Sequence, residues 1–146
     1  MNKDTVYLTQ TDTTVGFVSQ SNSKLSLAKQ RTPSKPAIMC VSSFKKQKKL
    51  TRVPKKFKKY IRRRDKTTFL YPNKKAIRVV KNGEHHMFLK NFFYLYSSSA
   101  NKNLEKFDLA YAKKQADILI QTHIGYKEQT ASSILKLSKN KIHKLR

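Results

Sequence analysis

The sequence predicts an α/β (α+β) fold in which a twisted sheet of mixed parallel and antiparallel strands is flanked by helices. Short segments rich in β-branched and aromatic residues alternate with segments whose apolar residues recur every three or four positions. Some strand segments are separated only by turns and others by a helix, so hairpins and crossovers would share one sheet. The length of 146 residues and the lack of a long linker indicate a single domain over residues 1–146.

The first half of the chain is expected to alternate between strands and short helices. Segments rich in Thr, Val, Tyr and Phe favour strands, serine favours the N-cap of a helix, and proline favours its first position. The expected elements are a strand pair within Thr5–Val18, a helix capped by Ser23 and ending at Gln30, a loop over Arg31–Pro36, a strand over Pro36–Val41, a helix over Phe44–Leu50 capped by Ser43, a helix over Pro54–Arg64 and a strand over Thr67–Tyr71.

The second half continues in the same way. A turn at Pro72-Asn73 separates the preceding strand from the next one. The expected elements are a strand over Ala76–Val80, a helix over Glu84–Phe93, a strand over Tyr94–Tyr96, a helix over Leu104–Gln115 capped by Asn103, and strands over Asp117–Gln121, Ser133–Leu137 and Lys141–Leu145.

The charge balance indicates polyanionic partners. The chain has 33 Lys and Arg residues against 8 Asp and Glu, which gives a formal net charge of +25. No apolar run is long enough for a membrane span, and the first residues lack the apolar core of a secretory signal. A single cysteine, Cys40, fits a reducing compartment and is expected in the core. We therefore expect a cytoplasmic protein without membrane association, a monomer or a weak dimer.

No metal site is expected from the sequence. The chain has four histidines and one cysteine, and no C-x-x-C pair. His85 and His86 are neighbours in a helical pattern, so their side chains would point about a quarter of a turn apart. We interpret this pair as surface residues.

The basic residues are concentrated in one segment. Between Lys45 and Lys66 there are thirteen Lys or Arg residues and one acid. In the helix expected over Pro54–Arg64, Phe57, Tyr60 and Ile61 share an apolar face. The opposite face would carry Lys55, Lys56, Lys58, Lys59, Arg62 and Arg63. These cations either contact RNA phosphates or form an ordinary solvated face. The apolar face is too small to favour a membrane surface.

Four polar patches suggest a ligand site. The first patch is Thr11-Asp12-Thr13-Thr14, which Gly16 follows. The second is Lys29-Gln30-Arg31 with Lys35 after it, and the third is a run of serines that ends at Asn101. Hydroxyls and cations at element ends suit a small polar or phosphorylated ligand. Each patch also has an ordinary explanation: a threonine-rich turn, cations that complement a helix dipole, or a serine-rich loop. The fourth patch is Ser132-Ser133-Ile134 with the terminal Arg146.

In this order the patches resemble the YrdC-like family of threonylcarbamoyl-adenylate synthases. The segment from Thr11 to Gly16 looks like the family's P-T-D-T-V-Y-G, and Lys29 to Pro36 looks like its K-x-R-P-x-x-K-P. The corresponding matches for the other motifs are Ile77-Arg78-Val79 with V-R-V, Ser99-Ala100-Asn101 with S-A-N, Ala116–Ile120 with A-D-V-I-I, Ser132–Leu137 with S-T-I-V-D-L, and Ile142–Arg146 with I-L-R.

The resemblance implies a fold and a reaction. The fold would be a twisted mixed sheet with a basic concave face. The reaction would convert L-threonine, bicarbonate and ATP, accompanied by Mg²⁺, into threonylcarbamoyl-AMP and pyrophosphate, a step towards threonylcarbamoyladenosine in tRNA. Members of the family also bind double-stranded RNA.

The resemblance also implies residue roles. Lys29 and Arg31 would be the catalytic residues that bind the triphosphate and the carboxylated threonine. Further contacts to ATP and its phosphates would come from Lys35, Ser99, Asn101 and Arg146, and Thr11, Thr13 and Ser133 would line the threonine pocket. The alternative is a member that has lost catalysis and acts as a module binding double-stranded RNA or tRNA, because the chain has only three glycines and a high positive charge.

Overall fold

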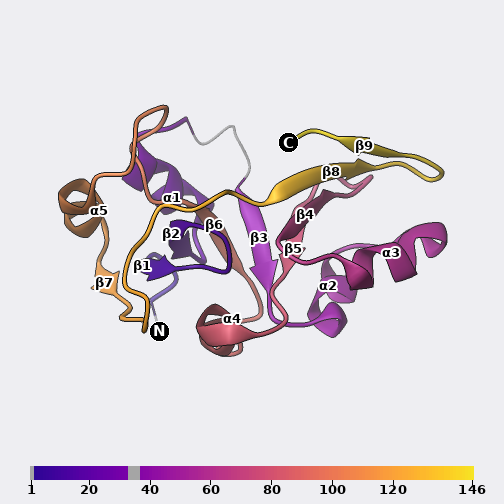
Figure 1. Cartoon of the computed structure of the whole chain (residues 1–146), viewed down its shortest axis with the longest axis horizontal. Helices are drawn as coiled ribbons and strands as arrows, with labels where there is room; N and C mark the ends of the chain where they lie inside the picture. Colours follow the sequence, from indigo (N-terminus) through magenta and orange to yellow (C-terminus); the bar gives the residue numbers. More distant parts are fainter. Residues whose placement is uncertain (1, 33–36) are drawn as a thin grey trace.

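A mixed β-sheet runs through the whole molecule (Figure 1). The computed structural model describes residues 2–32 and 37–146. Within them the sheet has nine strands in the order β7-β1-β2-β6-β3-β5-β4-β8-β9. The strands are β1 (Val6–Gln10), β2 (Val15–Ser19), β3 (Ile38–Val41), β4 (Thr67–Leu70), β5 (Ala76–Val79), β6 (Leu95–Ser99), β7 (Ile118–Leu119), β8 (Ser133–Leu137) and β9 (Ile142–Lys144).

Both strand orientations occur, as the sequence predicts. β1 and β7, β3 and β5, and β4 and β8 pair in parallel, whereas the other neighbours are antiparallel. The hairpins β1–β2, β4–β5 and β8–β9 account for three of the antiparallel pairs. The parallel pairs join segments that are distant in the sequence, and the C-terminal strand β8 therefore lies beside β4 in the middle of the chain.

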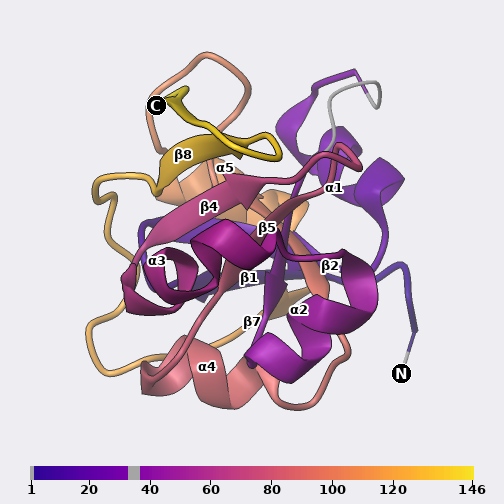
Figure 2. The same ribbon diagram turned by 90° about the vertical axis from the view of Figure 1, so that its right-hand side faces the viewer.

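Helices cover both faces of this sheet. They are α1 (Asn22–Lys29), α2 (Phe44–Leu50), a short 3₁₀ turn η1 (Lys55–Phe57), α3 (Lys58–Arg63), α4 (Gly83–Leu89) and α5 (Leu109–Gln115). The helices α2 and α3 lie at the same end of the molecule, in the foreground of Figure 2. None of the helices in the described part of the chain has the length and the apolar character needed to cross a bilayer.

Within residues 2–32 and 37–146 the core consists of three apolar clusters. Residues of α1 and α5 pack with Leu8 and Phe17 in one, and residues of α3 pack with Phe69 and Ile77 in another. The third cluster lies on the opposite face, where α4 packs against Cys40 and neighbouring strands. Because side chains alternate along a strand, Ile38, Cys40, Arg78, Leu95 and Ser97 also point to that face.

Several predicted elements are confirmed. Cys40 is fully buried in the core. Ser43 caps α2, and its Oγ accepts a hydrogen bond from the backbone N–H of Lys46 at 3.2 Å. The helix α1 ends at Lys29, one residue before the predicted end, because Gln30 is its left-handed C-cap. Its N-cap is Ser21, so the prediction of Ser23 is wrong. Ser21 Oγ accepts from Lys24 N at 3.3 Å.

Two helices are shorter than predicted. The expected helix over Leu104–Gln115 begins only at Leu109, and Asp108 caps it instead of Asn103. Leu104 has a φ of 66° and a 94% exposed side chain, so the apolar pattern that included it did not reflect burial. The helix predicted to reach Phe93 ends at Leu89.

The basic helix is divided into two parts. η1 covers Lys55–Phe57 and α3 covers Lys58–Arg63. Phe57 and Ile61 are buried, but Tyr60 is 37% exposed and packs edge-on against Phe69.

The interpretation of His85 as a surface residue is wrong. Its side chain is only 4% exposed, because α4 packs this side against the sheet. His86 is half-buried, and its Nδ1 lies 2.7 Å from the carbonyl oxygen of Val80.

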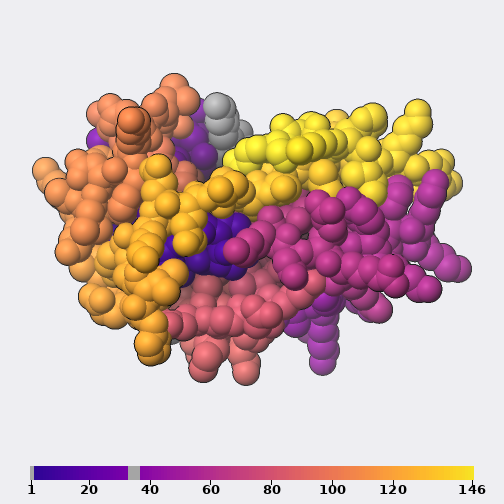
Figure 3. Space-filling view, viewed as in Figure 1, coloured from indigo at the N-terminus to yellow at the C-terminus, as the bar shows by residue number. Residues whose placement is uncertain are grey.

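The long connection between β7 and β8 folds over the N-terminal strands (Figure 3). Gln10 holds it there, since its amide accepts from Lys127 N at 2.7 Å and donates to Lys127 O at 3.2 Å. The backbone N–H of Val15 donates to the same carbonyl oxygen. This connection brings residues 131–134 to the ends of β2 and β6, where the largest group of predicted site residues lies.

Candidate functional site

A cavity of about 450 Å³ brings most of the sequence-predicted site residues together. Its walls come from the β1–β2 turn, the end of α1, β3, β5, the end of β6, and the chain around β8. Of the predicted residues, Thr11, Thr13, Lys29, Arg31, Ser99, Asn101 and Arg146 line it. We call it the main cavity.

One predicted residue, Ser133, does not line the main cavity. Ser132 lines the main cavity, whereas Ser133 is not among its lining residues and pairs with Thr67 in the β4–β8 ladder. Ser132 Oγ lies 2.8 Å from Thr68 Oγ1. Lys35 lies outside the described residues.

Lys29 is buried at the end of α1 and is held by four oxygens. Its Nζ donates to Ser99 O at 2.9 Å and Ser99 Oγ at 3.2 Å, and to Asn101 O at 3.0 Å and Asn101 Oδ1 at 3.1 Å. Burial, and then the charge of Arg31, lower the pKa of Lys29 to about 8. The ammonium therefore fixes the chain after β6 as well as adding charge to the cavity.

Arg31 presents a guanidinium with unused donors. Its backbone N–H donates to Ser26 O at 2.9 Å, which fixes the chain just beyond α1. Among the described residues, its buried Nε and Nη2 have no hydrogen-bond acceptor. Burial lowers the pKa of Arg31. Buried donors of this kind are rare in proteins unless a ligand or water pairs with them, so Arg31 is the side chain most clearly prepared for an anion.

The threonine cluster shapes the floor of the cavity. Thr11 Oγ1 donates to Thr14 O at 2.5 Å, lies 3.3 Å from Thr13 Oγ1, and accepts from Thr13 N at 3.2 Å. The hydroxyl of Thr11 is thus engaged within the turn. Gly16 is needed beside it, because a Cβ there would lie 2.9 Å from Ser98 O and 3.0 Å from the methyl carbon of Thr11.

Sequence reasoning missed Arg78 as a site residue. It lines the main cavity from the centre of β5, is 3% exposed, and donates from Nη2 to Asp12 Oδ1 at 3.0 Å. Burial lowers its pKa, but neighbouring groups that include the Asp12 carboxylate raise it more. The available signal was a lone charge between Ile77 and Val79, since a charged residue in an apolar strand needs a partner.

The C-terminal residue completes the cationic wall. The backbone of Arg146 pairs with Ile134, which places its side chain at the cavity. Its Nε donates to Ser132 O at 2.9 Å and its Nη2 to Ser132 Oγ at 3.3 Å. Burial, and then the charge of Arg78, lower the pKa of Arg146.

The main cavity is strongly electropositive. Four cations (Lys29, Arg31, Arg78 and Arg146) line it, and its described lining includes no Asp or Glu. Hydroxyl and amide groups from Ser99 and Asn101 lie between them. A cavity with this composition suits a ligand carrying two or more negative charges and several hydrogen-bond acceptors.

The basic face of η1 and α3 lies elsewhere. Its members are all exposed, and none of them lines the main cavity: Lys55, Lys56, Lys58, Lys59, Arg62 and Arg63. Lys56 donates to Asn140 O at 3.2 Å, so this face adjoins the β8–β9 hairpin. The structure therefore separates two cationic regions that differ in burial.

The family model described as "Telomere recombination", which covers Sua5, YciO and YrdC, matches residues 1–146. A search among curated protein sequences finds no match.

Solved structures share the fold at low identity. Sua5 of P. abyssi in complex with L-threonine superposes with a TM-score of 0.79 at 16% identity, and the match covers 99% of this chain and 50% of Sua5. YciO of E. coli gives 0.75 at 15%, with 97% and 82% covered. HypF in its phosphate- and nucleotide-bound form gives 0.74 at 11%, with 99% and 27% covered.

The chain thus spans about half the length of the Sua5 structures it matches. At these identities the structural likeness shows the fold, and the family model extends over the whole sequence. With the mixed sheet and the order of the motifs, these findings establish that the chain belongs to the Sua5/YciO/YrdC family.

Proposed function

We propose that the main cavity binds ATP and L-threonine and that the protein is a threonylcarbamoyl-AMP synthase acting towards threonylcarbamoyladenosine in tRNA. The observation that carries this proposal is the set of four cations around one cavity, with the buried Nε and Nη2 of Arg31 unpaired among the described residues. Such donors match the oxygens of a polyphosphate. A Sua5 with L-threonine and a HypF with phosphate and nucleotide, both similar in fold, support the choice of ligands.

The chemistry asks little covalent work of the protein. The amine of L-threonine and bicarbonate give a carbamate with loss of water, and a carbamate oxygen then attacks the α-phosphorus of ATP. The bond from that phosphorus to the bridging oxygen breaks, and pyrophosphate leaves with its electron pair. The protein must hold two anions, the carbamate and ATP, close together, and it must neutralise the charge on the leaving pyrophosphate. Fixed cations in a cavity can do both.

The roles follow the contacts. Arg31 would fork onto phosphate oxygens, and Arg78 and Arg146 would add positive charge. Lys29 positions Ser99 and Asn101, whose hydroxyl and amide groups would contact the nucleotide. Thr11 and Thr13 would form the floor of the threonine pocket, and Ser132, which lines the same cavity, would be their neighbour in place of Ser133.

Mg²⁺ would accompany the triphosphate. No group of three or more His, Cys, Asp or Glu side chains suited to a metal is present among the described residues. The described lining of the main cavity therefore offers Mg²⁺ no Asp or Glu ligand, and the ion would contribute the charge it brings with ATP.

Calorimetry of ATP–Mg²⁺ with and without L-threonine and bicarbonate tests this function. We expect ATP to bind and its affinity to rise when threonine is present. Threonine-dependent release of pyrophosphate, together with detection of the adenylate by mass spectrometry, would establish the reaction. A folded protein that binds neither ATP nor threonine would refute the proposal.

A second function is favoured by the exposed basic face. Six exposed cations on η1 and α3 and no acid among them suit a duplex RNA or tRNA backbone, read by shape and phosphate contact. Gel-shift titration with duplex RNA and tRNA tests it. Replacing Lys58, Lys59 and Arg62 by Gln should weaken RNA binding and leave ATP binding unchanged. RNA binding that is equally strong in this variant would show that this face is not the contact.

A further inference from the structure

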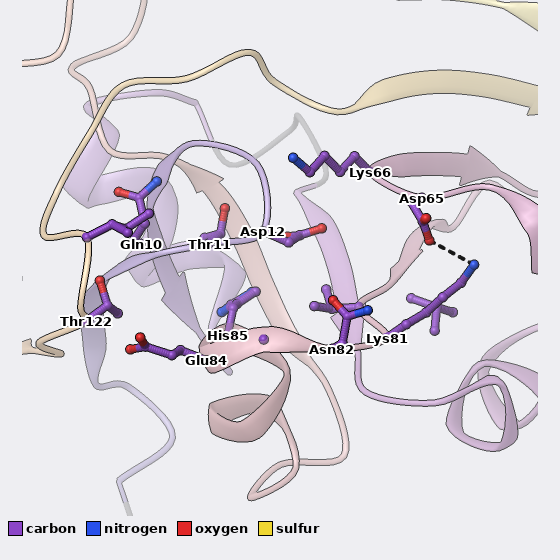
Figure 4. Close-up of a pocket in the computed structure, with 14 residues that line it drawn as sticks. Gln10, Thr11, Asp12, Asp65, Lys66, Lys81, Asn82, Glu84, His85 and Thr122 are labelled. Atoms are coloured by element: carbon purple, nitrogen blue, oxygen red, sulfur yellow. Dashed lines mark ion pairs between the residues drawn. The ribbon is translucent and has the colours of Figure 1, made fainter.

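A second cavity of about 340 Å³ lies beside the main one (Figure 4). Thr11 lines both cavities. Asp12 lines the second and Arg78 lines the main one, so their ion pair stands between the two. The other walls of the second cavity come from the start of α4, the chain before β4, and the segment after β7.

The second cavity gathers acids in a protein that has few. The chain has eight Asp and Glu residues, and three of them (Asp12, Asp65 and Glu84) line this space. Lys66 and Lys81 also line it, and Lys81 pairs with Asp65 at 2.9 Å. Its described lining thus has three acids and two lysines, whereas that of the main cavity has four cations and no Asp or Glu.

His85 points into this space. Figure 4 shows its ring rising from α4 towards Thr11 and Asp12. The side chain is 4% exposed, and neither Nδ1 nor Nε2 has a hydrogen-bond partner among the described residues. Burial lowers the pKa of His85 to about 4; the Asp12 carboxylate opposes this effect and the charge of Arg78 adds to it. The ring is thus neutral, and one nitrogen keeps a lone pair that needs a donor.

Asp12 has acceptor capacity in reserve. Its Oδ1 accepts from Arg78 at 3.0 Å, and the side chain is 14% exposed. A carboxylate has about four lone-pair positions on two oxygens, so one bond to Arg78 leaves room for a second donor. Glu84, 44% exposed at the edge of the cavity, accepts from the backbone N–H of His123 at 3.1 Å.

We propose that the second cavity binds a small organic amine as its ammonium ion, which donates N–H bonds to a ring nitrogen of His85 and to the carboxylate of Asp12. An ammonium ion supplies several donors and a positive charge, which the neutral imidazole and the nearby carboxylates both favour. An anion would meet the carboxylates of Asp12 and Glu84 beside His85, because Lys81 is already paired with Asp65. A metal ion is disfavoured because no group of three suitable ligands occurs among the described residues.

This site goes beyond the proposed function. Its ligand is a cation, held apart from the anions of the main cavity by the Asp12–Arg78 pair. Failure of amine binding would leave ATP and threonine binding untouched, and the reverse also holds.

The ring signals of His85 provide a local test. Histidine side-chain NMR spectra would be recorded with ethanolamine, putrescine and glycinamide, and with ethylene glycol as an uncharged match for ethanolamine. Comparison with His85→Gln assigns the signal. We expect a saturable shift of the His85 ring with amines and none with ethylene glycol. Preference for putrescine would indicate a polyamine, and preference for glycinamide an amine derived from an amino acid.

Variants separate a site from a surface effect. His85→Phe keeps a ring of similar size and should weaken amine binding about tenfold or more, because a hydrogen bond to a charged group is lost. Glu84→Gln changes an exposed residue and should weaken binding about threefold through the lost charge. Asp4→Asn, with the same change in charge elsewhere, should have no effect. If His85→Phe does not fold, Glu84→Gln against Asp4→Asn decides the matter. No saturable shift with any of the amines, or an equal shift with ethylene glycol, would overturn the proposal.

Discussion

The main cavity and the exposed face of η1 and α3 are both rich in Lys and Arg, but they differ in burial. In the main cavity, Arg31 and Arg78 are held in place and carry buried donors that have no partner among the described residues. On η1 and α3, Lys58, Lys59 and Arg62 extend into water. Burial strengthens the interaction of a charge with an anion and fixes its geometry, whereas an exposed charge is screened by salt. Position in the fold, and not the number of cations, thus separates a binding site from a charged surface.

The largest expected effect is a loss of ATP affinity when a buried cation of the main cavity is removed. Arg31→Ala should weaken ATP binding about 100-fold, because it removes charge-assisted hydrogen bonds from a partly buried guanidinium. Arg31→Lys should recover only part of this, since an ammonium cannot fork onto phosphate. Calorimetry measures both. Arg62→Ala, the matched exposed change, should alter ATP affinity less than about twofold. Equal losses of ATP affinity for Arg31→Ala and Arg62→Ala would show that the buried and the exposed cations do not differ in ATP binding.

The second prediction concerns the exposed side. If the basic face contacts about three phosphates of duplex RNA, affinity should fall on the order of 40-fold between 50 and 200 mM salt. ATP binding in the main cavity should change much less over the same range, because buried charges are screened less. Fluorescence anisotropy of labelled RNA, with ATP calorimetry in parallel, provides the measurement. RNA binding that does not depend on salt would contradict the phosphate-contact model.

The third prediction concerns the stability of the site. Lys29→Met removes the ammonium that four oxygens of Ser99 and Asn101 accept from. We expect the free energy of unfolding to fall by about 1–2 kcal/mol, because carbonyl and amide acceptors lose their donor. Lys59→Met on the exposed helix face should change it by less than about 0.5 kcal/mol. Denaturant titrations of the two variants test this, and similar stabilities would show that Lys29 does not hold the chain after β6.

The smallest expected effect is the uptake of a fraction of a proton by Lys29 when ATP binds. The pKa of Lys29 is lowered to about 8 in the folded protein. Between that value and its ordinary range the unfolded chain binds more protons, so the contribution of Lys29 makes the folded state more stable as pH rises. A bound polyphosphate favours the ammonium, so ATP binding above pH 8 should take up a fraction of a proton. Calorimetry in two buffers of different ionisation enthalpy measures the uptake. Lys29→Met should abolish it, and an uptake that remains would point to another group.

Local patterns predicted much of the fold and part of the site. The hydroxyl of Ser43 predicted the start of α2, and the apolar run before it predicted β3 to within two residues. Both predictions held because helix caps and strand composition act over a few residues. Leu104 misled the prediction, since an apolar side chain extended the helical pattern in a segment that does not pack. The prediction that His85 lies at the surface was also wrong, because the positions of two adjacent histidines do not show which side of a helix is buried.

The sequence by itself determined the family, the mixed sheet class, and the order of the polar patches at element ends. Only the tertiary structure decided which of those patches meet. The β4–β8 pairing and the return of Arg146 to Ile134 bring the C-terminus to the end of α1. Arg78 became a site residue, and His85 a buried one, through contacts with residues more than sixty positions away. Long-range strand pairing and burial depend on the packing of the whole chain, and no local pattern encodes them.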